Sequence, residues 1–240
     1  DVIDEGSIRR GKKAARHLWG NRASILAGDF LYASAMAKGL SFKNHDVNDA
    51  LQRACIRMIE GEMSQHIHHM DPDMLESVYI HIIQNKTASL MEAACSLAGI
   101  VSGASAEQRE ALRNFGLYLG TAFQVADDTL DYTATESRLG KTLGADLKEG
   151  KVTLPLIHLL KNGSPEERKM LLRLLGSETV NEIDLEKVLK LMRHHGSLNY
   201  ALSTAREYVE KAKGYLSPFE PSFEKSALCA VTDYVVTRDH

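Results

Sequence analysis

Apolar residues recur at helical spacing along almost the whole chain. Residues 22–40 and 47–66 are rich in Ala, Leu and Met, which favour helices, and a third apolar segment runs to about Val101. No segment alternates apolar and polar residues in the way that a half-buried strand does. The pattern therefore predicts an all-α protein.

Capping signals divide these apolar segments into separate helices. At three places a hydroxyl or carboxylate acceptor is followed three positions later by Glu or Gln, which is typical of a helix N-terminus. The pairs are Asp73 with Glu76, Ser105 with Gln108 and Ser164 with Glu167. The helix that starts after Ser105 is predicted to end near Tyr132, and Gly196 is predicted to separate two later helices.

Composition narrows the class of protein. A chain of 240 residues, of which 44% are hydrophobic, can bury one sizeable core, and no linker, repeat or low-complexity segment divides it. The formal net charge of −3 predicts no general attraction to nucleic acid. The longest uncharged stretch, Ala93 to Ala106, is too short to span a bilayer. Three dispersed cysteines are typical of reduced thiols in a cytosolic protein.

One helix carries an unusual acidic stripe. Gln124, Asp127, Asp128 and Asp131 are separated by three, four and seven positions, which places them on one helix face. Like charges at this spacing repel, so we expect a compensating charge. Carboxylate oxygens without nearby Cys or clustered His favour a hard cation such as Mg²⁺, which is usually held by one or two carboxylates and by substrate phosphates.

The alternative is that the stripe is an ordinary solvated acidic face. Its position argues against this, because it lies at the C-terminal end of the predicted helix, where the helix dipole disfavours anions.

Cationic residues near this stripe suggest a phosphate ligand. Lys141 and Lys151 lie in a glycine-containing loop, "GKTLGADLKEGK", that would let backbone and ammonium groups approach phosphate oxygens. Arg9 and Arg10 have the geometry for bidentate phosphate contacts. Lys86 precedes Thr87 in an otherwise apolar helix; by itself, Lys86 would more often be a surface lysine.

Together these segments resemble the trans-isoprenyl diphosphate synthases of the long-chain, octaprenyl-diphosphate-synthase type. That family has two aspartate-rich motifs of the form DD-x-x-D, the first followed by RRG. Here "DVIDEGSIRRG" resembles the first motif without its leading aspartate, and "DDTLD" matches the second. The resemblance extends over essentially the whole chain through "GNRASILAGDFLY", "KTASLMEAA", "GTAFQVADD", "GKTLGADLKEGKVTLPL" and "VVTRDH".

The resemblance implies a fold and a set of residue roles. The fold is a bundle of mostly antiparallel helices around a central cavity, with residues 1–240 forming one synthase domain that lacks the family's N-terminal helices. The implied Mg²⁺ ligands are Asp1, Asp4, Asp127, Asp128 and Asp131, with three ions present when substrate is bound. The implied contacts to the allylic diphosphate are Arg9, Lys86, Thr87, Gln124, Lys141 and Lys151, and Arg10 would help to bind isopentenyl diphosphate. The residues on which catalysis would most depend are Asp4, Asp127, Asp128 and Lys86.

The resemblance also implies an activity. The protein would be a cytoplasmic, homodimeric prenyltransferase that condenses isopentenyl diphosphate onto an allylic primer to make a long all-trans polyprenyl diphosphate. Because the chain begins inside the first motif, we expect this fragment alone to be inactive.

Other functions stay open at this point. A short-chain farnesyl or geranylgeranyl diphosphate synthase would share the motifs, and a non-catalytic subunit of a heteromeric synthase would share the fold. A terpene cyclase usually carries a different second metal motif, and a di-iron bundle would need Glu-x-x-His pairs, which do not occur in this sequence.

Overall fold

The computed structural model describes residues 2, 8–9, 12–133, 144–175 and 180–238. Nearly all of the described chain is helical. The elements in chain order are β1 (Ile8–Arg9), β2 (Lys12–Lys13), α1 (Ala15–Ser41), α2 (His45–Ile67), α3 (Glu76–Ile83), the π-helical turn η1 (Gln84–Ala88), α4 (Ser89–Val101), α5 (Ala106–Leu130), α7 (Ala145–Lys148), α8 (Leu154–Asn162), α9 (Pro165–Leu175), α10 (Glu182–His194), α11 (Ser197–Gly214) and α12 (Phe223–Thr237).

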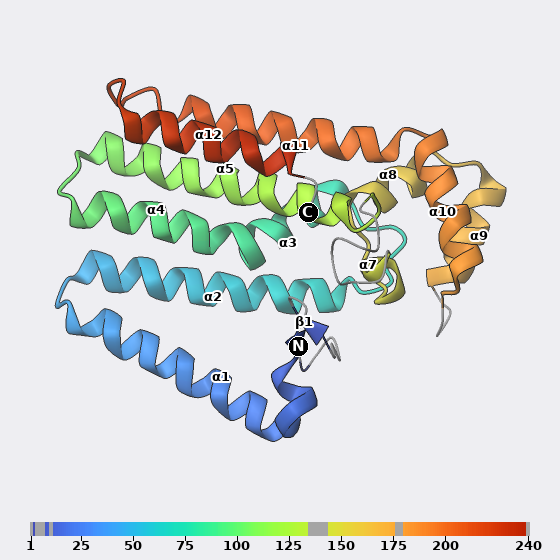
Figure 1. Ribbon diagram of the computed structural model, residues 1–240, viewed down its shortest axis with the longest axis horizontal. Helices are drawn as coiled ribbons and strands as arrows, with labels where there is room; N and C mark the ends of the chain where they lie inside the picture. The colour runs from blue at the N-terminus through green and yellow to red at the C-terminus, as the bar shows by residue number, and fades with distance from the viewer. Residues whose placement is uncertain (1, 3–7, 10–11, 134–143, 176–179, 239–240) are drawn as a thin grey trace.

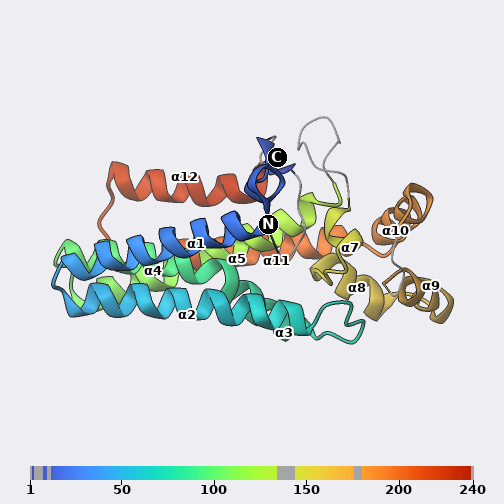
Figure 2. The same cartoon turned by 90° about the horizontal axis from the view of Figure 1, so that it is seen from below.

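The long helices form a layered bundle. In Figure 1, α1, α2, α4, α5 and α11 follow one another across the molecule, with α1 at one edge and α9 and α10 beyond one end. Figure 2 shows α12 on a separate side of the bundle, where it packs against α5 and α11. The predicted all-α class is confirmed; the short β1–β2 pair is the strand structure among the described residues. No helix of the described chain is both long and apolar enough to cross a membrane.

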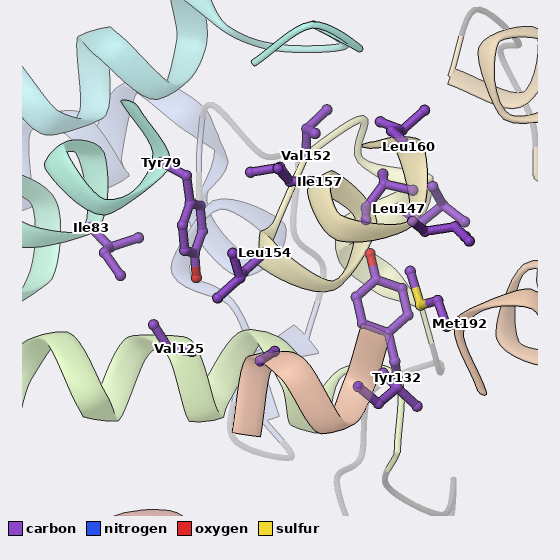
Figure 3. Packing of buried hydrophobic residues seen from close by; sticks show 14 of the residues in the cluster. Tyr79, Ile83, Val125, Tyr132, Leu147, Val152, Leu154, Ile157, Leu160 and Met192 are labelled. Atoms are coloured by element: carbon purple, nitrogen blue, oxygen red, sulfur yellow. The ribbon is translucent and has the colours of Figure 1, made fainter. Parts of the chain in front are cut away.

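The main core lies where α8 packs against α5, α10 and α11. Buried side chains from these elements form one continuous cluster that includes Val125, Leu154, Leu159, Val188 and Ala201. Figure 3 shows Tyr79 and Tyr132 entering this cluster from opposite sides. The core thus fixes the C-terminal half of α5, which carries the acidic stripe.

The predicted helix starts agree with the structure at two of the three capping pairs. Ser105 and Gln108 form a reciprocal capping box at the start of α5, and Ser164 exchanges hydrogen bonds with Glu167 at the start of α9. Gly196, with φ of 68°, separates α10 from α11 as predicted.

The predicted cap at Asp73 is wrong. Helix α3 begins at Glu76, after an extended Leu75 that makes no side-chain cap. The Asp73 carboxylate instead accepts a hydrogen bond from Arg168 Nη2 at 2.6 Å. A tertiary ion pair therefore takes the acceptor that the local pattern assigned to the helix.

Candidate active site

A chain of hydrogen bonds joins the acidic stripe of α5 to the turn η1. The hydroxyl of Thr87 donates to Gln124 Oε1 at 2.8 Å, and Gln124 Nε2 donates to Asp128 Oδ1 at 2.7 Å. On the other side, Tyr79 OH donates to Asp128 Oδ2 at 2.5 Å. In Figure 3 the hydroxyl of Tyr79 points away from its own helix and towards α5. Asp128 thus receives a neutral donor at each carboxylate oxygen.

Close helix packing holds the two ends of this chain together. A Cβ atom built on Gly120 would lie 2.6 Å from Ala88 Cα, so α5 touches η1 almost backbone to backbone at this point. Thr87 and Gln124 lie beside this contact, which explains how their side chains can meet from separate helices.

Burial makes Asp128 an unusual carboxyl group. Burial is the main cause that raises the pKa of Asp128 to about 6, and the nearby charges of Asp127 and Asp131 act in the same direction. The hydrogen bonds from Tyr79 and Gln124 lower this pKa. A buried carboxylate without a cationic partner is costly, so a bound cation would stabilise the ionised form.

Asp127 faces a different neighbour. Its carboxylate pairs with Arg238 Nη2 at 3.0 Å, just beyond the end of α12, and the Asp127 side chain is half exposed. The Arg238 guanidinium also lies 4.2 Å from the centre of the Phe123 ring. No described group accepts a hydrogen bond from the buried Arg238 Nε.

Asp131 supports the next segment of chain. It ends α5, and its carboxylate accepts hydrogen bonds from the backbone N–H groups of Ala145 and Asp146 at 3.2 and 3.0 Å, at the start of α7. These bonds place the carboxylate of Asp146 near Asp128. Burial, followed by the charges of Asp128 and Asp131, holds the pKa of Asp146 well above its usual range.

Lys86 is positioned by acceptors on α2. Its ammonium group donates to Gln65 Oε1 at 2.6 Å and pairs with Glu62 Oε2 at 2.8 Å. It is therefore not the solvated surface lysine that the apolar helix alone favoured. Glu62 and Gln65, which are three residues apart in α2, thus both contact Lys86.

Lys86, Thr87, Gln124, Asp128 and Asp146 line one pocket between α2, α3, η1, α5 and α7. Its polar lining is Gln65, His68, Tyr79, Lys86, Thr87, Gln124, Asp128, Asp146, Lys151 and Thr153, and its apolar lining is Met74, Ile82, Ile83 and Val152. Lys151 lies 2.6 Å from Glu149 and 4.0 Å from Asp146, and its side chain is largely buried. The pocket therefore combines ammonium groups, carboxylates and an apolar wall.

The carboxylates do not form a complete metal cage. Among the described residues, no group of three or more His, Cys, Asp and Glu side chains is arranged to hold an ion. Oxygen donors that are spread along a pocket fit Mg²⁺ bound jointly by protein and phosphate, because Mg²⁺ keeps waters and takes few protein carboxylates.

The structure brings together some of the predicted site residues but not all. Lys86, Thr87, Gln124, Asp128 and Lys151 share the pocket. Asp127 and Asp131 diverge from it, towards Arg238 and α7. Arg9 lies in β1. The predicted site residues outside the described chain are Asp1, Asp4, Arg10 and Lys141.

Three functional candidates were not singled out from the sequence. Tyr79 lies in the apolar run "SVYIHII" and has the pattern of a core aromatic residue. Asp146 lies in the loop that contains Lys141 and Lys151, and Arg238 is far from the acidic stripe along the chain. The signal in the sequence for Asp146 was a carboxylate two positions after Gly144, in the same loop as the two lysines.

Comparisons with known proteins show the family of the chain. The sequence model of the polyprenyl synthetase family matches residues 1–192. The chain belongs to the polyprenyl synthetase family. The predicted family and the all-α isoprenoid synthase fold are thereby confirmed, and the enzyme class is that of the transferases.

Individual relatives are similar over the full chain. The octaprenyl diphosphate synthase of Escherichia coli is 39% identical over 239 residues, covering 100% of this chain and 74% of the relative. A short chain isoprenyl diphosphate synthase of Methanothermobacter thermautotrophicus is 34% identical over 246 residues, with coverage of 100% and 74%. The crystal structure of a polyprenyl synthase from Caulobacter crescentus, complexed with calcium and isoprenyl diphosphate, has a TM-score of 0.95 at 38% identity and covers 100% of this chain and 73% of its own.

Proposed function

We propose that this protein is a Mg²⁺-dependent prenyltransferase that condenses isopentenyl diphosphate head to tail onto an allylic diphosphate and makes a long all-trans polyprenyl diphosphate. The observation that carries the proposal is the pocket in which Lys86 and Thr87 face Gln124 and Asp128. The similarity to octaprenyl diphosphate synthases supports the long product, and the similarity to a short-chain synthase keeps a shorter product as the alternative.

The donor set fits the proposed metal. Asp127 and Asp128 would hold Mg²⁺, with Asp131 reaching it through water, and Asp1 and Asp4 would hold it from the first motif. We infer three ions with substrate bound. When bound, Mg²⁺ supplies Lewis-acid stabilisation of the diphosphate.

The residues of the chain would act on the diphosphate directly. Lys86 and Lys151 offer ammonium groups, and Thr87 and Gln124 offer neutral donors, to the negative charge that grows as the allylic C–O bond breaks. Arg9 and Lys141 would add contacts to the same diphosphate, and Arg10 would bind isopentenyl diphosphate. The alkene of isopentenyl diphosphate then attacks the allylic cation, forming a C–C bond, and the proton lost from the product passes to the departing diphosphate.

The apolar wall has a separate task. Met74, Ile82, Ile83 and Val152 line the same pocket as the charged groups. Side chains of this kind exclude water, which would otherwise capture the allylic cation as an alcohol.

We further infer a cytoplasmic homodimer in which residues 1–240 form one catalytic domain. The support for the dimer is an exposed apolar surface on α1 and α2. Its larger members are Leu18, Trp19, Ile25, Leu26, Phe30, Leu31, Ile56, Ile59 and Met63, each more than half exposed. Large apolar side chains that are exposed on neighbouring helices are typical of a protein interface.

The test is the chain length of radiolabelled products. The full-length protein is incubated with labelled isopentenyl diphosphate, an allylic primer and MgCl₂, and the products are separated by reversed-phase chromatography after removal of the diphosphate. We expect a long-chain product that disappears with EDTA. A short product would replace the proposal with the short-chain alternative, and the absence of any product would favour a non-catalytic subunit.

A further inference from the structure

The turn η1 interrupts the helix that joins α3 to α4. A π turn contains one extra residue and i→i+5 hydrogen bonds, and such turns occur frequently at functional sites. Here the turn spans Gln84–Ala88 and contains both Lys86 and Thr87. The orientation of two proposed diphosphate contacts therefore depends on what holds this irregular turn.

Arg57 of α2 holds the turn through a single residue. Its Nε donates to Asn85 Oδ1 at 2.9 Å. The amide of Asn85 is also bound at its other end, because Nδ2 lies 2.9 Å from His81 Nε2. An amide with a donor on one side and an acceptor on the other has one orientation. Asn85 is buried, and its backbone carbonyl receives a further hydrogen bond from Ser89 Oγ at 2.5 Å.

The guanidinium of Arg57 is itself fixed. Its Nη1 pairs with Glu92, whose second carboxylate oxygen accepts from Arg113 Nη1 at 3.0 Å. The Glu92 side chain is nine-tenths buried. A buried carboxylate held between two guanidinium groups permits little movement of either.

The backbone of α2 also presses on the turn. A Cβ atom on Gly61 would lie 2.3 Å from the backbone nitrogen of Lys86, so the two segments touch at this glycine. Arg57, Gly61 and Gln65 are spaced by four residues and share one face of α2. This face therefore contacts the turn at Asn85, at the Lys86 backbone and at the Lys86 ammonium group.

We propose that Arg57 is a positioning residue for diphosphate binding. By holding Asn85 it sets the π turn, and the turn directs Lys86 and Thr87 into the pocket, although Arg57 itself lines a separate cleft between α2 and α4. The proposal rests on the proposed function, since it concerns the same pocket.

The test compares two variants that break the same contact from opposite sides. Arg57→Met removes the donor, and Asn85→Ala removes the acceptor while leaving the Arg57–Glu92 pair. We expect each to raise the dissociation constant of inorganic pyrophosphate, measured by calorimetry in MgCl₂, by about 10-fold, and to raise KM for the allylic substrate in parallel. Circular dichroism should show unchanged helicity in Asn85→Ala. This variant therefore tests the contact even if Arg57→Met folds poorly.

The matched control is Arg53→Met. Arg53 lies one turn earlier on α2, is largely exposed, and pairs with Asp49 on the surface. We expect its pyrophosphate affinity to equal that of the wild type.

The same Arg57 substitution in a protein without the Lys86 and Thr87 side chains distinguishes a positioning role of Arg57 from a general structural role. When Lys86→Ala and Thr87→Ala are already present, adding Arg57→Met should change the pyrophosphate dissociation constant less than about twofold, because nothing remains to be positioned. An undiminished tenfold effect in this background would overturn the proposal, as would wild-type affinity in both single variants. A wild-type protein that binds no pyrophosphate would instead overturn the proposed function.

Discussion

The guanidinium of Arg238 lies 3.0 Å from the carboxylate of Asp127, although 111 residues separate them along the chain. The pair joins the end of α12 to the acidic stripe of α5. Since Asp127 is a proposed metal ligand, the Arg238 guanidinium and a metal ion would compete for the same carboxylate.

Removing Arg238 should therefore strengthen metal binding in the absence of substrate. A half-exposed pair of this kind contributes about 1 kcal/mol, which corresponds to about fivefold in affinity. We expect Arg238→Met to bind Mn²⁺ two- to fivefold more tightly than the wild type, measured by the loss of the free Mn²⁺ signal in electron paramagnetic resonance. Arg238→Lys keeps the charge and should stay close to the wild type. Equal Mn²⁺ affinity in all three proteins would show that the pair does not compete with metal.

The two adjacent aspartates should be indispensable for turnover. Asp127→Ala and Asp128→Ala are each expected to lower kcat/KM by about 100-fold or more, because each removes charge that holds the diphosphate through metal. Far-UV circular dichroism should remain that of the wild type. Glu186→Gln, on the exposed face of α10, is a control that changes one carboxylate far from the pocket. Near-wild-type turnover in either alanine variant would refute the site.

The raised pKa of Asp128 should appear in the pH dependence of stability. Its folded-state pKa of about 6 is above the unfolded value, so the folded protein binds this proton more tightly. The resulting stabilisation is complete below about pH 4 and is lost as the pH rises through about 6. Asp128→Asn does not titrate at this position.

The free energy of unfolding of Asp128→Asn should therefore rise relative to that of the metal-free wild type between about pH 4 and 6, by up to about 3 kcal/mol. Urea titrations across this range measure the difference. Because the charge of Asp128 also raises the pKa of Asp146, both proteins are compared in an Asp146→Asn background. Parallel pH profiles for the two proteins would contradict the assignment of the shift to Asp128.

The contact between α5 and η1 can be tested at one glycine. Gly120→Ala would place a methyl group 2.6 Å from Ala88 Cα, and forcing two backbones apart costs about 1–3 kcal/mol. We expect a lower urea midpoint together with a raised KM for the allylic substrate, because Thr87 moves away from Gln124. The control is Gly214→Ala at the end of α11, where a Cβ atom would meet nothing within 4 Å. A Gly120→Ala protein as stable as that control would mean that the helices separate freely.

The spacing of the acidic residues predicted much of the site, but it did not predict that neighbouring aspartates would have different partners. Periodicity places Gln124, Asp127 and Asp128 on one side of a helix, and in the structure Gln124 and Asp128 line the pocket. It does not predict what lies opposite, and here Asp128 meets Tyr79 while Asp127 meets Arg238. These partners come from remote parts of the chain and carry no local signal.

Sequence patterns also failed to predict the local structure where contacts with remote residues determine it. The π turn at Lys86 has no recognisable sequence pattern, and Arg57 and Gly61, which contact it, come from the separate helix α2. The cap predicted at Asp73 is lost to Arg168 for the same reason. Capping boxes with no competing partner, such as that of Ser105, were predicted correctly.

The hydroxyl of Thr87 has one hydrogen atom, and in this structure it points to Gln124. A phosphate oxygen that arrives beside Thr87 can receive that hydrogen only when the O–H bond rotates away from the amide. Gln124 then keeps its bond to Asp128 but has a carbonyl oxygen ready for another donor. Binding of a phosphate would thus require only rotation of the Thr87 O–H bond, with every heavy atom of these side chains still in place.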